Sequence, residues 1–247
     1  MKSLNKIVVV SLLFIVAVCA KASASPKSTF KIIAYEIVDR HLSGFNSVDL
    51  GGPFDVYITQ GQEESVKVEA PADMMEHIIT EVIDGELKVY SKHDNWHWGD
   101  LWGNHRKIIV RVVIKEVNSL KIGGSGDMFF REGIKANALK LHISGSGDMK
   151  GQVEAKTLES SISGSGDMSL SGTADKSTVS VVGSGDFAAR DLITVKTEVR
   201  VSGSGDARIN ASEEVDAAVN GSGDVSYAGK AKVVHKEKTG SGDIRRF

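Results

Sequence analysis

An aspartate recurs through the second half of the 247-residue chain, each time at the end of the tetrapeptide Gly-Ser-Gly-Asp. Successive aspartates are 18 to 21 residues apart: Asp127, Asp148, Asp167, Asp186, Asp206, Asp224 and Asp243. Regularly spaced carboxylates could hold hard cations such as Ca²⁺, which prefers carboxylate and carbonyl oxygens as ligands. No histidine recurs beside the serine of the tetrapeptide to act as its base. The repeat therefore does not indicate a nucleophilic catalyst.

The same tetrapeptide can instead be a corner that the chain turns once per repeat. Its glycines would supply positive φ angles, and its Asp and Ser side chains would bond N–H groups of the turn within and between repeats. Two or three such hydrogen bonds per carboxylate would keep each aspartate ionised beside its neighbours. We favour this structural role over a cation ladder, and both over catalysis. The predicted corner glycines are Gly124, Gly126, Gly145, Gly147, Gly164, Gly166, Gly183, Gly185, Gly203, Gly205, Gly221 and Gly223.

A second candidate site is the segment 93–105, "HDNWHWGDLWGNH", which holds all three tryptophans of the chain, Trp96, Trp98 and Trp102. Exposed tryptophans serve as binding anchors that stack on sugar rings or fill pockets of a partner. The alternative is that these rings cover an end or flank of the fold. Zinc binding by the three histidines of the segment, His93, His97 and His105, is less favoured because their spacing matches no familiar ligand pattern.

Enzyme signatures are absent from the sequence. It contains no G-x-S-x-G elbow, no H-E-x-x-H and no P-loop. The one cysteine, Cys19, lies in the apolar N-terminal stretch. A formal net charge of −2 and a pI of about 6.4 give no basic footprint for nucleic acid.

Elements that would position the aspartates follow from stacking the repeats on one another. Two residues before each Gly-Ser-Gly-Asp stand Ile122, Ile143, Ile162, Val181, Val201, Val219 and Lys238. Polar residues alternate with these apolar ones, which is the period of a half-buried strand. A strand, a glycine corner and a second strand in ~19 residues predict an all-β fold, a single-stranded parallel β-helix of stacked coils. Lys236 and Lys238 would cap its last coil with charge.

The first coil is predicted upstream of the regular repeats. Residues 47–58 align without a gap on 119–130, which pairs Leu50 with Ile122, Asp55 with Asp127 and Val56 with Met128. The intervening 72 residues would hold further coils and a divergent insertion. The insertion should contain strands at 65–70 and 107–114, a short helix at 72–79, and a hairpin at 81–90 that turns at Asp84-Gly85.

The N-terminus has the composition of a secretory signal peptide. Lys2 and Lys6 precede the apolar run 7–18, and Ala22-Ser23-Ala24 supplies a cleavage site. We predict a signal peptide at 1–24, a lead-in segment at 25–44 and one domain at 45–247, with regular coils over 118–247. Lipidation of Cys19 is an alternative, although the preceding Val18 is larger than that reaction prefers. No transmembrane segment is expected in the mature chain.

The segments 45–71 and 82–92, together with the repeated "ISGSGDM", resemble the bacterial auto-transporter adhesin family with the head GIN domain. The resemblance covers 45–247. It implies a right-handed parallel β-helix and an adhesive role in Bacteroidetes-type secreted proteins, and it brings no catalytic residues. The chain departs from the family pattern at Pro53-Phe54 and in the tryptophan segment.

The expected function is that of a secreted, non-enzymatic adhesin or cell-surface binding module. Its partner would be a glycan, a matrix component or a protein, engaged by the flat side of the solenoid or by Trp96, Trp98 and Trp102. The alternatives are a carbohydrate-active enzyme built on a β-helix and a passive structural protein of the envelope. No cofactor is expected, with Ca²⁺ on the aspartates as the alternative, and the location would be the periplasm, the cell surface or the medium.

Overall fold

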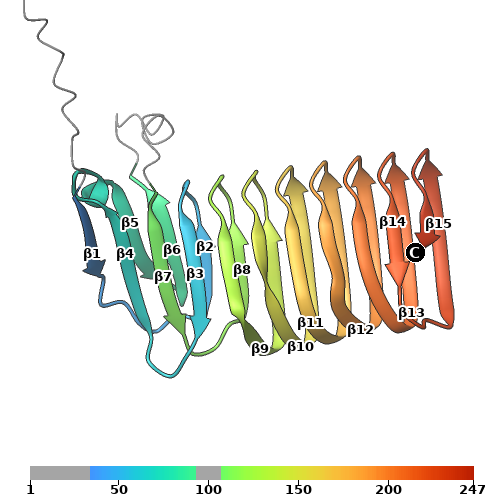
Figure 1. Cartoon of the computed structure of the whole chain (residues 1–247), viewed down its shortest axis with the longest axis horizontal. Coiled ribbons are helices and arrows are strands. Elements are labelled where there is room, and N and C mark those ends of the chain that lie inside the picture. The colour runs from blue at the N-terminus through green and yellow to red at the C-terminus, as the bar shows by residue number, and fades with distance from the viewer. Residues whose placement is uncertain (1–33, 93–106) are drawn as a thin grey trace, which may run out of the picture. The chain divides into compact units, whose positions relative to one another are not determined.

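The computed structural model describes residues 34–92 and 107–247, which build a solenoid of stacked coils (Figure 1). Each regular coil is a single long strand of 15 to 17 residues that bends midway, followed by one Gly-Ser-Gly-Asp corner. These strands are β9 (Met128–Ile143), β10 (Met149–Gly164), β11 (Met168–Gly183), β12 (Phe187–Gly203) and β13 (Ala207–Gly221). Neighbouring coils pair in parallel. The predicted all-β solenoid with coils of about 19 residues is confirmed, and the right-handed sense stays a prediction.

The core consists of apolar columns that run from coil to coil along the stack. In one column the side chains are Cα partners in neighbouring strands and none is more than 2% exposed. Its members are Val89, Leu50, Ile122, Ile143, Ile162, Val181, Val201 and Val219. β-branched side chains pack well on a pleated surface, so alternation within each strand places the same kind of residue inside every coil.

The coils near the N-terminus do not stack in the order of the chain. The strands concerned are β2 (Ser47–Leu50), β3 (Asp55–Gln60), β6 (Glu86–Ser91), β7 (Ile109–Ile114) and β8 (Ser119–Ile122). Strand β2 pairs in parallel with both β6 and β8, and β3 pairs with both β7 and β9. The β2–β3 coil therefore lies between two later coils. The predicted pairings of Leu50 with Ile122 and of Val56 with Met128 are confirmed.

Antiparallel strands extend this end of the stack. They are β1 (Tyr35–Asp39), β4 (Ser65–Pro71) and β5 (Ile78–Ile83). Strand β4 pairs with β7 and β1, and β5 forms the predicted hairpin with β6 through Asp84 and Gly85, at φ 51° and 76°. The helix predicted at 72–79 is a 3₁₀ helix, η1 (Ala72–His77), that ends two residues early. Ile78 and Ile79 join β5 instead, because the hairpin pairs their main chain with β6.

The last coil carries the predicted charged cap. It consists of β14 (Val225–Ala228), β15 (Val233–Gly240) and β16 (Ile244–Arg246). Lys236 and Lys238 are the Cα partners of Ala217 and Val219, yet both lysines are exposed. Lys236 Nζ donates a 3.0 Å hydrogen bond to the carbonyl oxygen of Ile244 and lies 4.9 Å from the ring centroid of Tyr227. Within the described residues, no helix has the length and apolar character needed to cross a bilayer.

Candidate functional site

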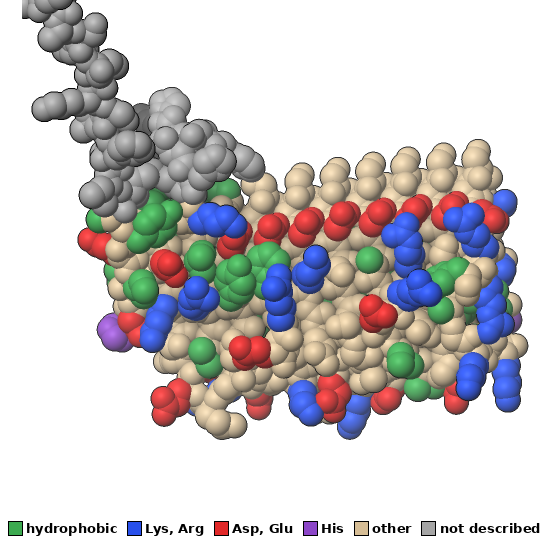
Figure 2. Space-filling model, viewed as in Figure 1, with side chains coloured by type: hydrophobic (Ala, Val, Ile, Leu, Met, Phe, Trp, Pro, Cys, Tyr) green, Lys and Arg blue, Asp and Glu red, His purple; other side chains and the backbone are tan. Residues whose placement is uncertain are grey.

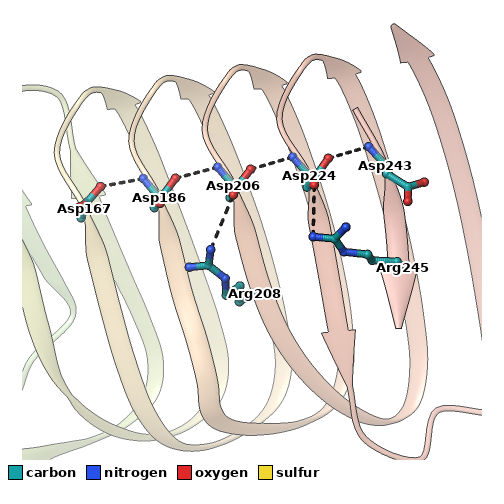
Figure 3. A network of polar contacts seen from close by, with 7 residues as sticks. All are labelled: Asp167, Asp186, Asp206, Arg208, Asp224, Asp243 and Arg245. Carbon is teal, nitrogen blue, oxygen red and sulfur yellow. Dashed lines mark hydrogen bonds and ion pairs between the residues drawn. The ribbon is translucent and has the colours of Figure 1, made fainter. Parts of the chain in front are cut away.

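The repeated aspartates form a ladder of hydrogen bonds that joins one corner to the next (Figure 3). The main-chain N–H of Asp148 donates to Oδ1 of Asp127 over 2.9 Å, and the same bond recurs five more times up to Asp243, at 2.8 to 3.0 Å. In the opposite direction, the N–H of Met128 donates to the carbonyl oxygen of Asp148 over 2.8 Å. Each corner is thus bonded to the next through both the side chain and the main chain of its aspartate.

Every ladder carboxylate from Asp127 to Asp224 accepts one main-chain N–H from the next coil, where the sequence predicted two or three. In Asp206 and Asp224 the second carboxylate oxygen lies 3.7 and 3.5 Å from Arg208 and Arg245. No group of three or more His, Cys, Asp or Glu side chains in the described part of the chain is arranged to hold a metal ion. The hydrogen bonds between coils support the corner interpretation.

Asp55 occupies the predicted position beside the ladder but is not a rung of it. The N–H of Asp127 donates to the carbonyl oxygen of Phe54 over 3.0 Å, not to the carboxylate of Asp55. That carboxylate instead lies 3.5 Å from Lys107 Nζ. The replacement of Ser-Gly by Pro53-Phe54 changes the corner, so the side-chain ladder begins at Asp127.

The two corner glycines have different roles. The second glycine of each tetrapeptide is buried, and a Cβ atom there would lie 1.9 to 2.3 Å from a carbonyl oxygen of the preceding coil. Its φ lies outside the left-handed region, contrary to the prediction for Gly126 and Gly166. Positive φ is found at the first glycine, and only in later coils: Gly164, Gly183, Gly203, Gly221 and Gly240. The close approach of two backbones therefore explains the second glycine.

Trp96, Trp98 and Trp102, and the histidines His93, His97 and His105, lie outside the described residues, as does the predicted signal peptide at 1–24. Their roles stay predictions.

A hollow of about 410 Å³, which sequence reasoning missed, lies on the face next to the aspartate ladder. Its walls are β9 and β12, which carry extra residues relative to β10 and β11 between them. Three residues of β9, Arg131–Gly133, oppose the single residue Gln152 of β10. On β12, Ala189 and Arg190 oppose the single residue Leu170 of β11. The only sequence sign of these bulges is the longer spacing of the repeats that contain them.

The hollow carries a surplus of positive charge. Four cations line it, Arg131, Lys150, Arg190 and Arg208, against one carboxylate, Asp191. Figure 2 shows this face, with Lys and Arg side chains on either side of a largely uncharged stretch below the acidic row.

Aromatic rings hold the two wall arginines. The guanidinium carbon of Arg131 lies 5.4 Å from the ring centroid of Phe129, and that ring stacks on Tyr57 at 5.0 Å. Arg190 lies 4.8 Å from the ring centroid of Phe247. Cation–π contacts of this kind restrict a long side chain without neutralising its charge.

Two other features are weaker candidates. A second hollow of about 630 Å³ follows the bend of the coils, over a floor that includes Ala136, Ala155 and Ala174. On the opposite arm of the coils, burial first and Glu86 second raise the pKa of Asp49, and Glu86 itself bonds Lys121 at 2.6 Å. Asp49 lines neither hollow.

Solved structures with the same fold come from Bacteroides and Parabacteroides species. A protein from Bacteroides fragilis described as a putative adhesin is 25% identical, with a TM-score of 0.81 over 87% of this chain and 97% of its own. A second, from Parabacteroides distasonis and also described as a putative adhesin, is 22% identical, with a TM-score of 0.71 over 87% and 98%. A third from that organism, described as a putative lipid binding protein, is 24% identical, with a TM-score of 0.67 over 86% and 96%.

The last two, at these identities, show the likeness of fold alone. No curated protein matches the sequence. The family model described as "Putative auto-transporter adhesin, head GIN domain" matches residues 44–231. That match covers most of the solenoid, and the chain belongs to this family.

Proposed function

We propose that this chain is an extracytoplasmic, non-enzymatic binding module that attaches to a glycan or a protein through a flat face of its solenoid. The family description and the adhesin description of the Bacteroides fragilis relative support this proposal. The observation that carries it is the register of the coils. Outward side chains of successive strands align at about 4.8 Å, so one face presents an extended row of contacts to a long or repetitive partner.

The chemistry of the hollow favours binding over catalysis. Glycoside hydrolysis generally needs two carboxyl groups on either side of the bond that is cleaved. The described lining of the hollow contains one carboxylate, Asp191. The nearby ladder carboxylates of Asp148 and Asp167 each accept a main-chain N–H from the next coil, which is a structural role.

Export from the cytoplasm is part of the proposal. The predicted signal peptide at 1–24 and the family's adhesin description both support a location in the periplasm, on the cell surface or in the medium. Edman sequencing of the protein recovered from the producing cells should begin close to residue 25.

The test is retention of the purified secreted protein on arrays of glycans and matrix proteins, with the supernatant assayed for released reducing ends. We expect saturable retention without release of product. Release of reducing ends from any bound polysaccharide would establish the enzyme alternative instead. Absence of retention on every surface would contradict the binding function itself and favour a passive structural role.

A further inference from the structure

We infer that the hollow between the β9 and β12 bulges is a binding site for an acidic polysaccharide, whose carboxylate or sulfate groups are held by Arg131 and Arg190. This inference rests on the proposed binding function and names the class of its partner. It follows from the shape of the walls, the side chains of the floor and the distribution of charge.

The walls place two arginines opposite each other. Bulges redirect side chains out of the regular alternation of a strand, and both Arg131 and Arg190 belong to such bulges. Strands β10 and β11 lie between the walls, so the bulged main chains are three strand spacings apart, or about 14 Å. Two arginines carried on main chains this far apart suit successive charged groups along one polymer better than a single small anion.

The floor is polar, with long side chains on β10 and short ones on β11. Its outward residues are Lys150 and Gln152 on β10, and Ser169 and Ser171 on β11. Serine hydroxyls and the glutamine amide can both donate and accept hydrogen bonds, which is what sugar hydroxyls require.

Charge selects the acidic members of this class. Arginine binds carboxylate and sulfate groups through two parallel N–H donors. Arg131 contacts the ring of Phe129 on its own strand, and the ring beside Arg190 belongs to Phe247, which follows β16 at the C-terminal end of the stack. The aspartate ladder runs alongside the hollow. Its carboxylates repel an anionic chain from that side and so confine the polymer to the basic row.

Other anionic partners fit the hollow less well. A peptide that adds as a strand needs a free sheet edge, whereas β10 and β11 are paired on both sides. A lipid would need apolar surface for its acyl chains, and the exposed floor residues are lysine, glutamine and serine.

The experiment is affinity electrophoresis of the full mature chain at 0.15 M salt, in gels that contain polygalacturonate, dextran sulfate or neutral dextran. Polyglutamate gels and co-sedimentation with phosphatidylglycerol vesicles represent the peptide and lipid alternatives. The variants are Arg131→Ala/Arg190→Ala and the charge-conserving Arg131→Lys/Arg190→Lys. The control is Lys140→Ala/Lys176→Ala, which removes the same charge from exposed positions outside the hollow.

We expect retention by at least one acidic polysaccharide and none by dextran. The double alanine variant should lose affinity about tenfold or more, since it removes the charge-assisted hydrogen bonds of both arginines. The Arg131→Lys/Arg190→Lys variant should show an intermediate loss, because lysine lacks the paired N–H donors of arginine. The control Lys140→Ala/Lys176→Ala should bind as tightly as the wild type. Thermal unfolding would verify that all variants fold alike.

Three results would overturn the inference. The first is an equal loss in the lysine control, which would mean that only net charge matters. The second is arginine-dependent binding to polyglutamate or vesicles that is as tight as binding to polysaccharide. The third is no retention by either acidic polysaccharide while the arrays still retain the protein, which would leave the binding function intact and remove only this site. Loss of retention on the arrays as well would contradict the proposed function.

Discussion

The main-chain N–H of Asp206 donates a 2.8 Å hydrogen bond to Oδ1 of Asp186, twenty residues earlier in the chain and one coil away in space. The same relationship joins six successive pairs of coils. Each of these aspartates stabilises the corner of the next coil. Its replacement should therefore lower the free energy of unfolding more than it lowers binding affinity.

Asp186→Ala should lower the free energy of unfolding by about 1 kcal/mol, because the partly buried N–H of Asp206 loses its acceptor. Asp186→Asn retains a carbonyl oxygen and should lie closer to the wild type. Urea unfolding measures both. Asp243→Ala is the matched control, because Asp243 ends the ladder and no later described corner donates to it. Equal losses at Asp186 and Asp243 would argue against the ladder.

Gly166→Ala should destabilise the protein by about 2 kcal/mol or more, through overpacking. The added Cβ would lie 2.1 Å from the carbonyl oxygen of Gly147, although the φ of Gly166 is outside the left-handed region. Gly123→Ala is the control, since its nearest neighbour would be 3.8 Å away. Thermal and urea unfolding of the two variants should differ clearly. A neutral Gly166→Ala would contradict the close approach of the coils.

Ser160→Ala should raise the free energy of unfolding by about 1 kcal/mol. Ser160 lies between Leu141 and Val179 in a core column, is 1% exposed, and its hydroxyl has no hydrogen-bond partner in the described structure. Ser160→Val should also fill space in the column. Both are measured by chemical denaturation.

The buried threonine pair provides the comparison for Ser160. Thr194 Oγ1 lies 2.6 Å from Thr197 Oγ1 and donates to the carbonyl oxygen of Asn210 over 2.9 Å. Thr194→Val should therefore destabilise the protein by about 1 kcal/mol. If Ser160→Ala were destabilising as well, the idea of an unsatisfied hydroxyl would be wrong.

Asp49→Asn should stabilise the protein at pH 7, and the gain should disappear in acid. Burial and Glu86 raise the pKa of Asp49 in the folded state, against the attraction of Lys121, Lys88 and His142. A carboxyl with a raised folded pKa binds its proton more tightly when folded, so the stability of the wild type falls as pH rises from the unfolded pKa through the folded one.

The measurement is urea unfolding of Asp49→Asn and wild type at pH 7 and at pH 3, below the ordinary pKa of an aspartate. Asp175→Asn, at an exposed position, is the control. A less stable Asp49→Asn at pH 7 would show that the attraction to the lysines outweighs the effect of burial.

Much of the fold is predictable from the sequence because each coil of a solenoid follows from a local sequence pattern that is repeated along the chain. Alternation around Ile143 and Ile162 predicts a half-buried strand, and the constant spacing to the next corner predicts which residues stack. The Asp84-Gly85 turn between two alternating strands predicts its hairpin in the same way. Each of these depends only on residues that are near one another in sequence or on copies of one pattern.

The order of the first coils did not follow from the sequence. Leu50 aligns with Ile122 and is its partner, but Val89 pairs with Leu50 on the other side. Strand β6 lacks the corner motif, so no repeat signal shows that it stacks outside a coil that precedes it in the chain. Only contacts between distant segments decide that order.

The sequence alone therefore determined the coil, its corner and its apolar columns, since a period repeated seven times admits one way to bury its Ile and Val side chains. The tertiary structure decided why the second glycine must be glycine, because a clash with the preceding coil exists only once the coils are stacked. It also decided where Arg131 and Arg190 lie. The two regular strands β10 and β11 separate the bulges that carry these arginines, and no local sequence pattern predicts the distance between the bulges.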